Sequence, residues 1–156
     1  MNISDGFLNV SRSIGWEGET LFLRACQKRG LDWRQASKHD NMYNHIDFFV
    51  GKDGKELSVD VKGSKDRVLL EYKNVRGNKG WLYGKADYIA FLSPSKDFFL
   101  MVPRQVLAEY AERFKTAPFG YKELYKLYSR KDRDDLMVYV QWQDIEQLNN
   151  TKIWEL

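Results

Sequence analysis

Asp47, Asp60 and Lys62 have the types and spacing of residues that could carry out metal-dependent hydrolysis. Carboxylate oxygens are ligands that Mg²⁺ prefers. A bound divalent cation orients a phosphate and lowers the pKa of a bound water, and a nearby lysine can activate that water or balance charge. This chemistry needs the two carboxylates and the amine to converge, so the chain must fold back on itself between Asp47 and Asp60.

A β-hairpin bent at residues 53–54 would bring them together. Asp-Gly between two β-like runs is the strongest short-range hairpin signal, and it favours a two-residue turn. Counting outward from that turn places Asp47 opposite Asp60 and His45 opposite Lys62. The same count pairs apolar residues on the other face, namely Val50 with Leu57, Phe48 with Val59 and Ile46 with Val61. A one-residue slip would turn one strand's apolar set outward, so the pattern supports this register.

Two facing aspartates in a sheet repel each other unless something neutralises them. Cβ atoms of facing residues lie about 4.5–5.5 Å apart, and like charges at that separation are destabilising. Either one acid takes up a proton or a divalent cation binds between the two. Lys62 follows Asp60 on the same face of the strand. The hairpin therefore predicts a hydrolytic site for a hard metal ion.

Residues 71–73 form a second acid-x-Lys triplet and offer an alternative site. Such triplets occur readily in a chain in which 30% of the residues are charged. The strand that carries Glu71 has no acid held opposite by a tight turn, which favours residues 60–62. For His45 two interpretations remain, a contact with a phosphate or local hydrogen bonds at the strand edge.

An acid, a hairpin and Asp-x-Lys together resemble the signature of the PD-(D/E)XK nuclease superfamily. Asp47 matches the first acid, Asp60 the second and Lys62 the lysine, while Ile46 stands where the family pattern has proline. The resemblance covers roughly residues 15–107. It implies the α/β (α+β) class and a restriction-endonuclease-like αβββαβ core, in which helices flank a central mixed sheet.

The helix before the hairpin resembles the Holliday-junction-resolvase branch of this superfamily. That branch has a glutamate about eleven residues before the glycine that ends the helix. Glu19 and Gly30 have this separation (30 − 19 = 11), and Phe22 and Cys26 lie on the same helix face as Glu19. Glu17 is the alternative helix acid.

The resemblance implies a role for each of these residues. Asp47 and Asp60 would bind Mg²⁺ or Mn²⁺, the Val61 carbonyl would be a further ligand, and Glu19 would complete the metal shell. Lys62 would position or deprotonate the attacking water and stabilise the developing charge. The expected function is a Mg²⁺-dependent DNA endonuclease, with branched DNA as a substrate and a homodimer as the assembly. The alternative is a nuclease fold with a degraded site that binds DNA or a protein partner without cutting.

Basic residues beyond the hairpin are candidates for contacts with the DNA backbone, because lysine and arginine supply most non-specific affinity for phosphates. These candidates are Lys65, Arg67, Lys73, Arg76, Lys79 and Lys85, with Trp81 as a residue that could stack on bases. Three glycines punctuate residues 74–85 and allow close backbone approach. The alternative is a mobile connection in which Trp81 closes the edge of the core.

The remaining segments complete an α+β order. Apolar spacing and capping signals predict a helix from Ser13 to Gly30, strands at 67–73, 87–92 and 98–102, a helix from Pro103 to Phe114, a strand at 136–142 and a short helix at 143–148. Residues 121–130 are consistent with a helix or an irregular segment.

Length and composition narrow the class of protein. The 156 residues predict one nuclease-like domain, and the single cysteine excludes an internal disulfide. The sequence shows neither a run of about 18 apolar residues nor a secretory signal, so we expect a cytoplasmic protein without a membrane partner. The net charge of +3 is compatible with DNA as a partner. The small size favours an accessory nuclease of a phage or mobile element.

Overall fold

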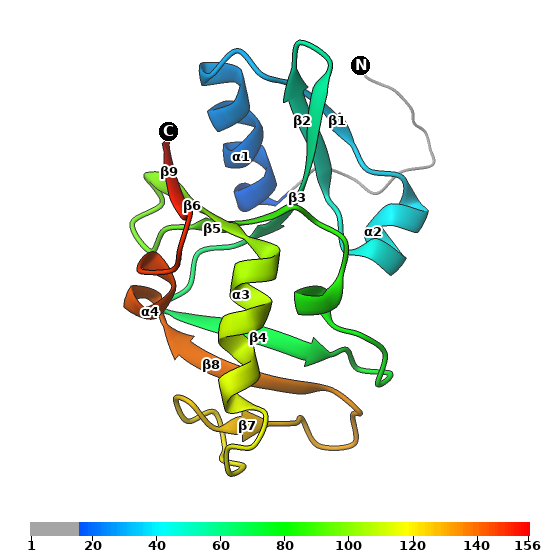
Figure 1. Ribbon diagram of the computed structural model, residues 1–156, viewed down its shortest axis with the longest axis vertical. Coiled ribbons are helices and arrows are strands. Elements are labelled where there is room, and N and C mark those ends of the chain that lie inside the picture. The colour runs from blue at the N-terminus through cyan, green and yellow to red at the C-terminus, as the bar shows by residue number, and fades with distance from the viewer. Residues whose placement is uncertain (1–15) are drawn as a thin grey trace.

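The fold comprises two β-sheets with α-helices around them, and the computed structural model describes it over residues 16–156 (Figure 1). In chain order the elements are α1 (Glu17–Lys28), β1 (Asp32–Gln35), α2 (Lys38–Asn44), β2 (Phe48–Lys52), β3 (Lys55–Lys62), β4 (Arg67–Lys73), η1 (Trp81–Tyr83), β5 (Tyr88–Leu92), β6 (Phe98–Pro103), α3 (Arg104–Ala111), η2 (Glu112–Phe114), β7 (Leu127–Tyr128), β8 (Leu136–Gln141), α4 (Trp142–Glu146) and β9 (Lys152–Glu155).

The larger sheet has the strand order β1-β2-β3-β5-β6-β9. Its strands β3 and β5 are parallel, whereas its other neighbours are antiparallel. This confirms the predicted α+β class with a mixed sheet. The smaller sheet has the order β4-β8-β7 and lies at the end of the molecule away from α1 and the β2–β3 hairpin (Figure 1).

The sequence predicts β4 as the third strand of a single central sheet, and this prediction is wrong. The strand beside β3 is β5, and β4 belongs to the smaller sheet. From Ile89 to Leu92 every residue of β5 is buried, while β4 alternates between buried and half-buried residues. A central strand is covered on both faces and reads as a continuous apolar run, so β5 suits this place better than β4 does.

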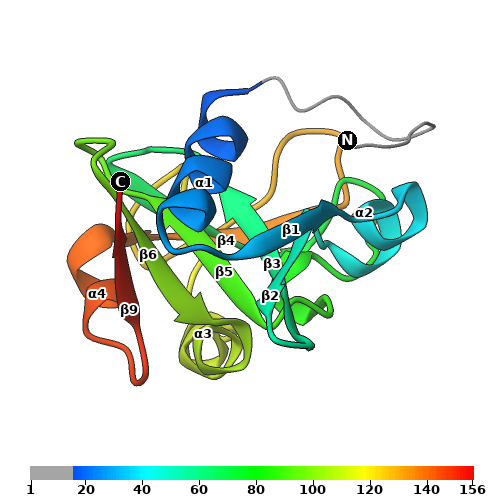
Figure 2. The same cartoon turned by 90° about the horizontal axis from the view of Figure 1, so that it is seen from above.

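Each face of the larger sheet has its own hydrophobic core. On one face, Phe22 and Cys26 of α1 pack with Val59 and Val61 of β3. On the other face, the core continues to α3, η1 and the smaller sheet. Figure 2 shows α1 and α3 on opposite sides of the larger sheet. Because side chains alternate along a strand, Asp60 and Lys62 point to the side of the smaller sheet.

Helix α1 begins at Glu17, later than the predicted serine cap. Ser13 itself lies outside the described residues. The end of the helix agrees with the prediction, since Gly30 has φ +66°, which suits a residue without a side chain. The predicted helix after Pro103 is also confirmed as α3, with Pro103 as its N-cap residue.

Several short elements were not predicted, among them β1, α2 and β9. Strand β1 has the polar sequence DWRQ and is held by its ladder with β2. Helix α2 is capped by Ser37, whose Oγ accepts a hydrogen bond from Asp40 N at 3.0 Å. Strand β9 pairs with β6 at the other edge of the sheet. Such edge elements lack the apolar periodicity on which sequence prediction depends.

Within residues 16–156, we find no helix of the length and apolar character needed to cross a bilayer. The division of the chain into one domain stays a prediction.

Candidate metal and nucleic-acid site

The β2–β3 hairpin has the turn and the register that the sequence predicts. Asp53 and Gly54 both have positive φ, +55° and +80°, which is the pattern of a two-residue type I′ turn. The ladder pairs Phe48 with Val59 and Phe49 with Ser58, as counting outward from the turn requires. The hairpin therefore holds the neighbourhood of Asp60 in a fixed position against β2.

The ladder ends one step too early for the predicted Asp47–Asp60 pair. Its last pair is Phe48–Val59, and the predicted pairs Ile46–Val61, Asp47–Asp60 and His45–Lys62 do not form. The reason is helix α2, whose C-cap residue His45 has a left-handed backbone with φ +55°. This conformation turns the chain, so residues 45–47 do not continue the extended line of β2. The predicted apolar face also changes, because Leu57 is exposed and Ile46 joins the core on the other side.

Asp47 nevertheless reaches β3 through its side chain. Its Oδ2 accepts a hydrogen bond of 2.7 Å from Val61 N, which would otherwise need a ladder partner. Its Oδ1 accepts a bond of 2.9 Å from Asn41 Nδ2 of α2. Asp47 N also donates a backbone hydrogen bond of 2.8 Å to the Val59 carbonyl, and the carboxylate takes the place of the backbone partner that Val61 N would have in a continued ladder.

Asp47 and Asp60 form a buried acid pair. Asp47 is 9% exposed and Asp60 is 5% exposed. Burial raises the pKa of Asp60 to about 8; Lys62 opposes this rise, and the charge of Asp47 and a hydrogen bond with it add to the rise. Because the pKa exceeds 7, Asp60 carries a proton near neutral pH when no cation is bound.

The acid pair fits a divalent cation. Two carboxylates from β3 and the entry to β2 lie close enough to hydrogen-bond to each other. Asp60 Oδ2 is buried, and its ion-pair partner is Lys62 Nζ at 3.3 Å. Asp47 and Asp60 would hold such a cation in place of the proton on Asp60, and its positive charge would offset the negative charges of the two carboxylates.

Lys62 lies between the acid pair and an aromatic ring. Besides its ion pair with Asp60, its Nζ is 4.7 Å from the ring centroid of Trp81 in η1. The cation–π contact and the ion pair together restrict the long side chain. Lys62 is therefore held with its amine next to the carboxylates.

A cavity of about 350 Å³ opens next to Lys62, and we call it the basic groove. It lies between the end of β3 and β4, over η1 and α4. The residues that line it include the cations Lys62, Lys65 and Arg67, together with His45, Gly63, Glu71 and the aromatic residues Trp81, Phe91 and Trp142. The groove thus offers several positive charges beside the acid pair.

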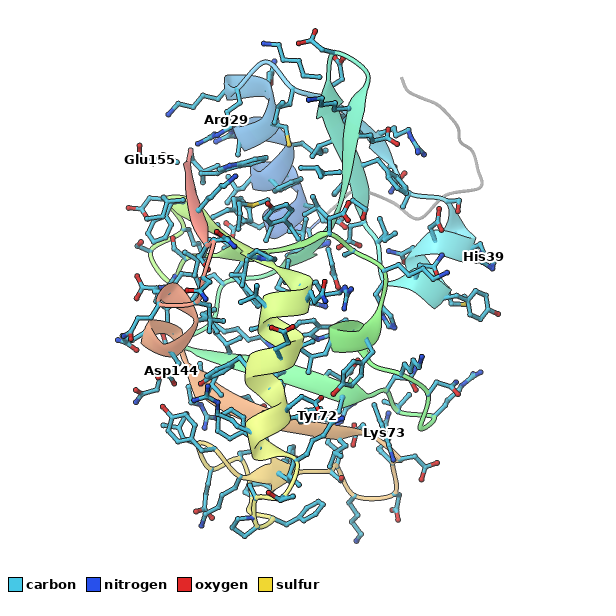
Figure 3. The ribbon with its side chains drawn as sticks, viewed as in Figure 1. Arg29, His39, Tyr72, Lys73, Asp144 and Glu155 are labelled. Carbon is cyan, nitrogen blue, oxygen red and sulfur yellow. The ribbon has the colours of Figure 1, made fainter. Side chains whose placement is uncertain are left out.

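Some of the predicted DNA contacts meet at the groove and others do not. Lys65, Arg67 and Trp81 line it. Lys73 ends β4 on the side away from α4 (Figure 3) and pairs with Lys79 in an isolated bridge. Arg76 lies in the exposed turn between these two lysines, and Lys85 is exposed after η1. Their roles in DNA binding stay predictions.

For His45 and Trp81 the sequence left open a structural role and a role at the site, and in the structure each residue meets the conditions for both. His45 Nε2 lies 3.2 Å from the Lys79 carbonyl, as the local hydrogen-bond interpretation expects, yet the ring also lines the groove. Trp81 is 6% exposed and belongs to the core, while one side of it faces the groove. Both residues serve the structure and border the candidate site.

The two acids of helix α1, Glu17 and Glu19, differ from each other in burial. Glu19 is buried on α1, and Glu17 is exposed with an ion pair of 2.9 Å to Lys96. In the described part of the chain, no three acidic, histidine or cysteine side chains come together as a metal-binding group. The proposed parts of Glu19 and of the Val61 carbonyl in metal binding stay predictions.

Among the groove residues that sequence reasoning did not assign to this site are Glu71, Phe91 and Trp142. The sequence offered Glu71 as an alternative acid on its own strand, and the structure places it in the lining of the same groove as Lys62. The available signal was the alternation of β4, which places Arg67, Leu69 and Glu71 on one face. Phe91 and Trp142 reach the groove through tertiary contacts alone.

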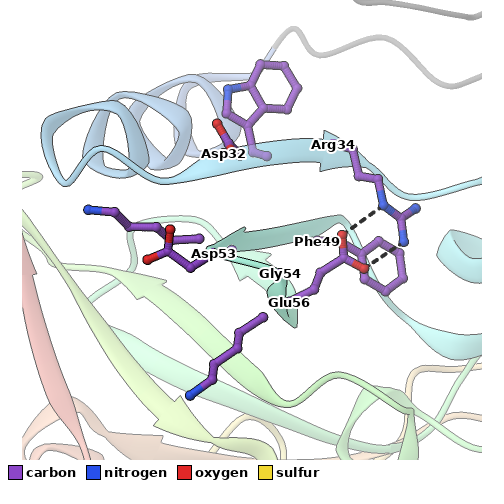
Figure 4. Close-up of a pocket in the computed structure, with 10 residues that line it drawn as sticks. Asp32, Arg34, Phe49, Asp53, Gly54 and Glu56 are labelled. Carbon is purple, nitrogen blue, oxygen red and sulfur yellow. Dashed lines mark hydrogen bonds and ion pairs between the residues drawn. The ribbon is translucent and has the colours of Figure 1, made fainter.

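A second cavity, of about 370 Å³, lies at the opposite end of the hairpin (Figure 4). It is lined by the turn and by β1, and Arg34 forms hydrogen bonds of 2.9 and 3.0 Å with Glu56 beside it. The guanidinium also lies over the Phe49 ring, 4.0 Å from its centroid. These contacts satisfy the charges locally, and the acid pair takes no part in this cavity.

Comparison with known proteins gives one structural likeness. Neither the family models nor the curated proteins contain a match to this chain. Among solved structures, a bacterial homing endonuclease, I-Ssp6803I, is similar with a TM-score of 0.46 and 15% sequence identity. The match covers 60% of this chain and 68% of that one.

Proposed function

We propose that the protein is a metal-dependent DNA endonuclease of the PD-(D/E)XK type. The observation that carries the proposal is the buried Asp47–Asp60 pair with Lys62 Nζ 3.3 Å from Asp60 Oδ2, because Lys62 also lines the basic groove. Buried carboxylates are costly unless paired or bound to a metal. Two acids kept next to each other out of water are better explained by a cation site than by stability.

The residues divide the work of phosphodiester hydrolysis between them. Asp47 and Asp60 would hold Mg²⁺ or Mn²⁺, which supplies Lewis-acid activation of a phosphate and its attacking water. Lys62 lies where its ammonium can balance charge that develops on the phosphate or orient the water. Lys65 and Arg67 would position the DNA backbone in the groove without reading its sequence.

The test is nicking of supercoiled plasmid DNA with Mg²⁺ or Mn²⁺ present. We expect the wild-type protein to nick the plasmid and Asp60→Asn to lose nearly all of this activity. Asp53→Asn is the matched control, because it makes the same chemical change at the exposed turn, where asparagine also accepts positive φ. Equal activity of Asp60→Asn and the wild type would contradict the proposal.

The same experiment separates cutting from binding alone. If the protein binds DNA in a gel-shift assay but never nicks it with either cation, the chain is a binding module with a nuclease-like site. Substrate structure is tested with a panel of four-way junctions, single strands and duplexes. Preference for junctions and a homodimer would support the resolvase-like prediction.

A further inference from the structure

The outer face of the smaller sheet presents a row of aromatic side chains. Val68 of β4 and Val138 of β8 point into the core, so their strand neighbours point outward. Tyr139 of β8 is half-buried on this outer face and pairs with Leu69 of β4. Tyr128 of β7 is also half-buried and lies on the same face.

Three tyrosines follow one another across this face. The ring centroids of Tyr139 and Tyr128 are 6.4 Å apart, and those of Tyr128 and Tyr121 are 5.7 Å apart. Tyr139 and Tyr128 are half-buried, whereas Tyr121 at the end of the row is 75% exposed. We call these residues the tyrosine row. Aromatic side chains that adjoin one another at the surface, as these three do, are typical of an interaction site.

Arg67 joins the tyrosine row to the basic groove. Its guanidinium lies over the Tyr139 ring, 4.3 Å from the centroid, and it lines the groove as well. Its Nη1 also donates a hydrogen bond to the Lys122 carbonyl, which fixes the segment that carries Tyr121. A planar guanidinium on a tyrosine is itself a surface on which a base can stack.

The charges along this path favour a polyanion. Lys62, Lys65 and Arg67 line the groove, and Lys122 Nζ lies 5.4 Å from the Tyr121 ring centroid. Glu71 is the acid of the groove. Alternating cations and flat rings are the surface that unpaired nucleic acid recognises, because cations follow its phosphates and rings take its bases. The bases of an intact duplex are stacked on each other and cannot use such rings.

We propose that the tyrosine row and the basic groove form one track for an unpaired DNA strand, which enters at Tyr121 and passes Arg67 toward Asp60. The inference rests on the proposed function for the choice of DNA and for the direction of the strand. It identifies the substrate as DNA that is single-stranded next to the cleaved phosphate. Binding along the track needs no metal and can be measured without cleavage.

The test is fluorescence anisotropy with a labelled thymidine oligonucleotide of about 20 residues in EDTA, a length that spans more than one stacking platform. We expect tighter binding of this strand than of a duplex of equal length. Tyr121→Ala should weaken single-strand binding at least about fivefold, the lower limit for loss of one stacked base. Tyr121→Phe should bind like the wild type, because a base stacks on the aromatic ring and does not need the hydroxyl group.

Tyr43→Ala is the matched control, since Tyr43 is 66% exposed on α2, outside the track. It should leave binding unchanged. Duplex binding as tight as single-strand binding, or unchanged affinity in Tyr121→Ala, would overturn the inference. If the oligonucleotide results hold but neither the plasmid nor any DNA of the panel is cut with Mg²⁺ or Mn²⁺, the endonuclease proposal fails and the track remains. If nicking occurs and Tyr121→Ala has no effect on binding, the track fails and the endonuclease remains.

Discussion

The acid pair of the larger sheet and the tyrosine row of the smaller sheet differ in how far their side chains are exposed to solvent. Asp47 and Asp60 are buried, with exposures of 9% and 5%, whereas Tyr121 is 75% exposed. Burial strengthens every electrostatic interaction of the acids and suits an ion that stays in place. Exposure of the tyrosines suits a flexible partner that binds and leaves. On the two proposals made above, the larger sheet carries the residues that cleave DNA and the smaller sheet carries the residues that bind it.

The largest effect is expected from Lys62, which lies where the two regions meet. Lys62→Ala should lower the rate of plasmid nicking at least about 100-fold, as loss of a group that stabilises developing charge does. Affinity for single-stranded DNA should change little by comparison. Lys55→Ala, at the exposed start of the same strand, is the control and should keep full activity. Equal losses of rate and affinity in Lys62→Ala would contradict the separation of roles.

The acid pair should also give the protein a distinctive pH dependence without metal. The pKa of Asp60 is raised from 3.8 to about 8 by burial, so the folded protein binds this proton more tightly than the unfolded chain. The resulting stabilisation is fully present below about pH 4 and is lost as the pH rises through about 8. Stability in EDTA should therefore fall across this range by an amount on the order of a few kcal/mol.

Urea unfolding at about pH 5 and about pH 8 measures this fall in the free energy of unfolding. Asp60→Asn cannot titrate and should show a smaller fall than the wild type, while Asp53→Asn should match the wild type. If Asp60→Asn shows the same pH dependence as the wild type, Asp60 does not hold a proton at neutral pH.

The smallest effect is expected from single cations of the track. Arg67→Gln should reduce the slope of log affinity against log salt for single-stranded DNA by about 0.7, the value for one phosphate contact. Lys73→Gln, at the other end of β4, should change the slope less (Figure 3). If Lys73→Gln changes this slope more than Arg67→Gln does, the DNA follows the loop at 74–80 and not the proposed track.

Local signals in the sequence were sufficient to predict the hairpin. Asp53-Gly54 fixes the turn, and the apolar alternation fixes the register of Phe48 with Val59. The exact Asp47–Asp60 pairing was wrong, because the left-handed residue His45 at the end of α2 diverts the chain. Such a diversion depends on how α2 packs, which residues 38–44 alone do not reveal.

The smaller sheet and the groove depend on contacts between distant segments. Strand β7 has only two residues, and its place beside β8 comes from pairing of Leu127 with Val138. Residues 121–130 therefore show no clear hydrophobic periodicity, and the sequence could not predict which surface their tyrosines occupy. Trp142 likewise reaches the groove only because β8 pairs with β4. Pairings of this kind are not encoded in local propensity.

The central claim is that Asp47 and Asp60 together hold one divalent cation, and calorimetric titration with Mn²⁺ tests it most directly. We expect the wild type and Asp53→Asn to bind one equivalent with similar affinity, with protons released as Asp60 ionises. Asp47→Asn and Asp60→Asn should each lose this binding. Undiminished Mn²⁺ binding in both of these variants would contradict the account.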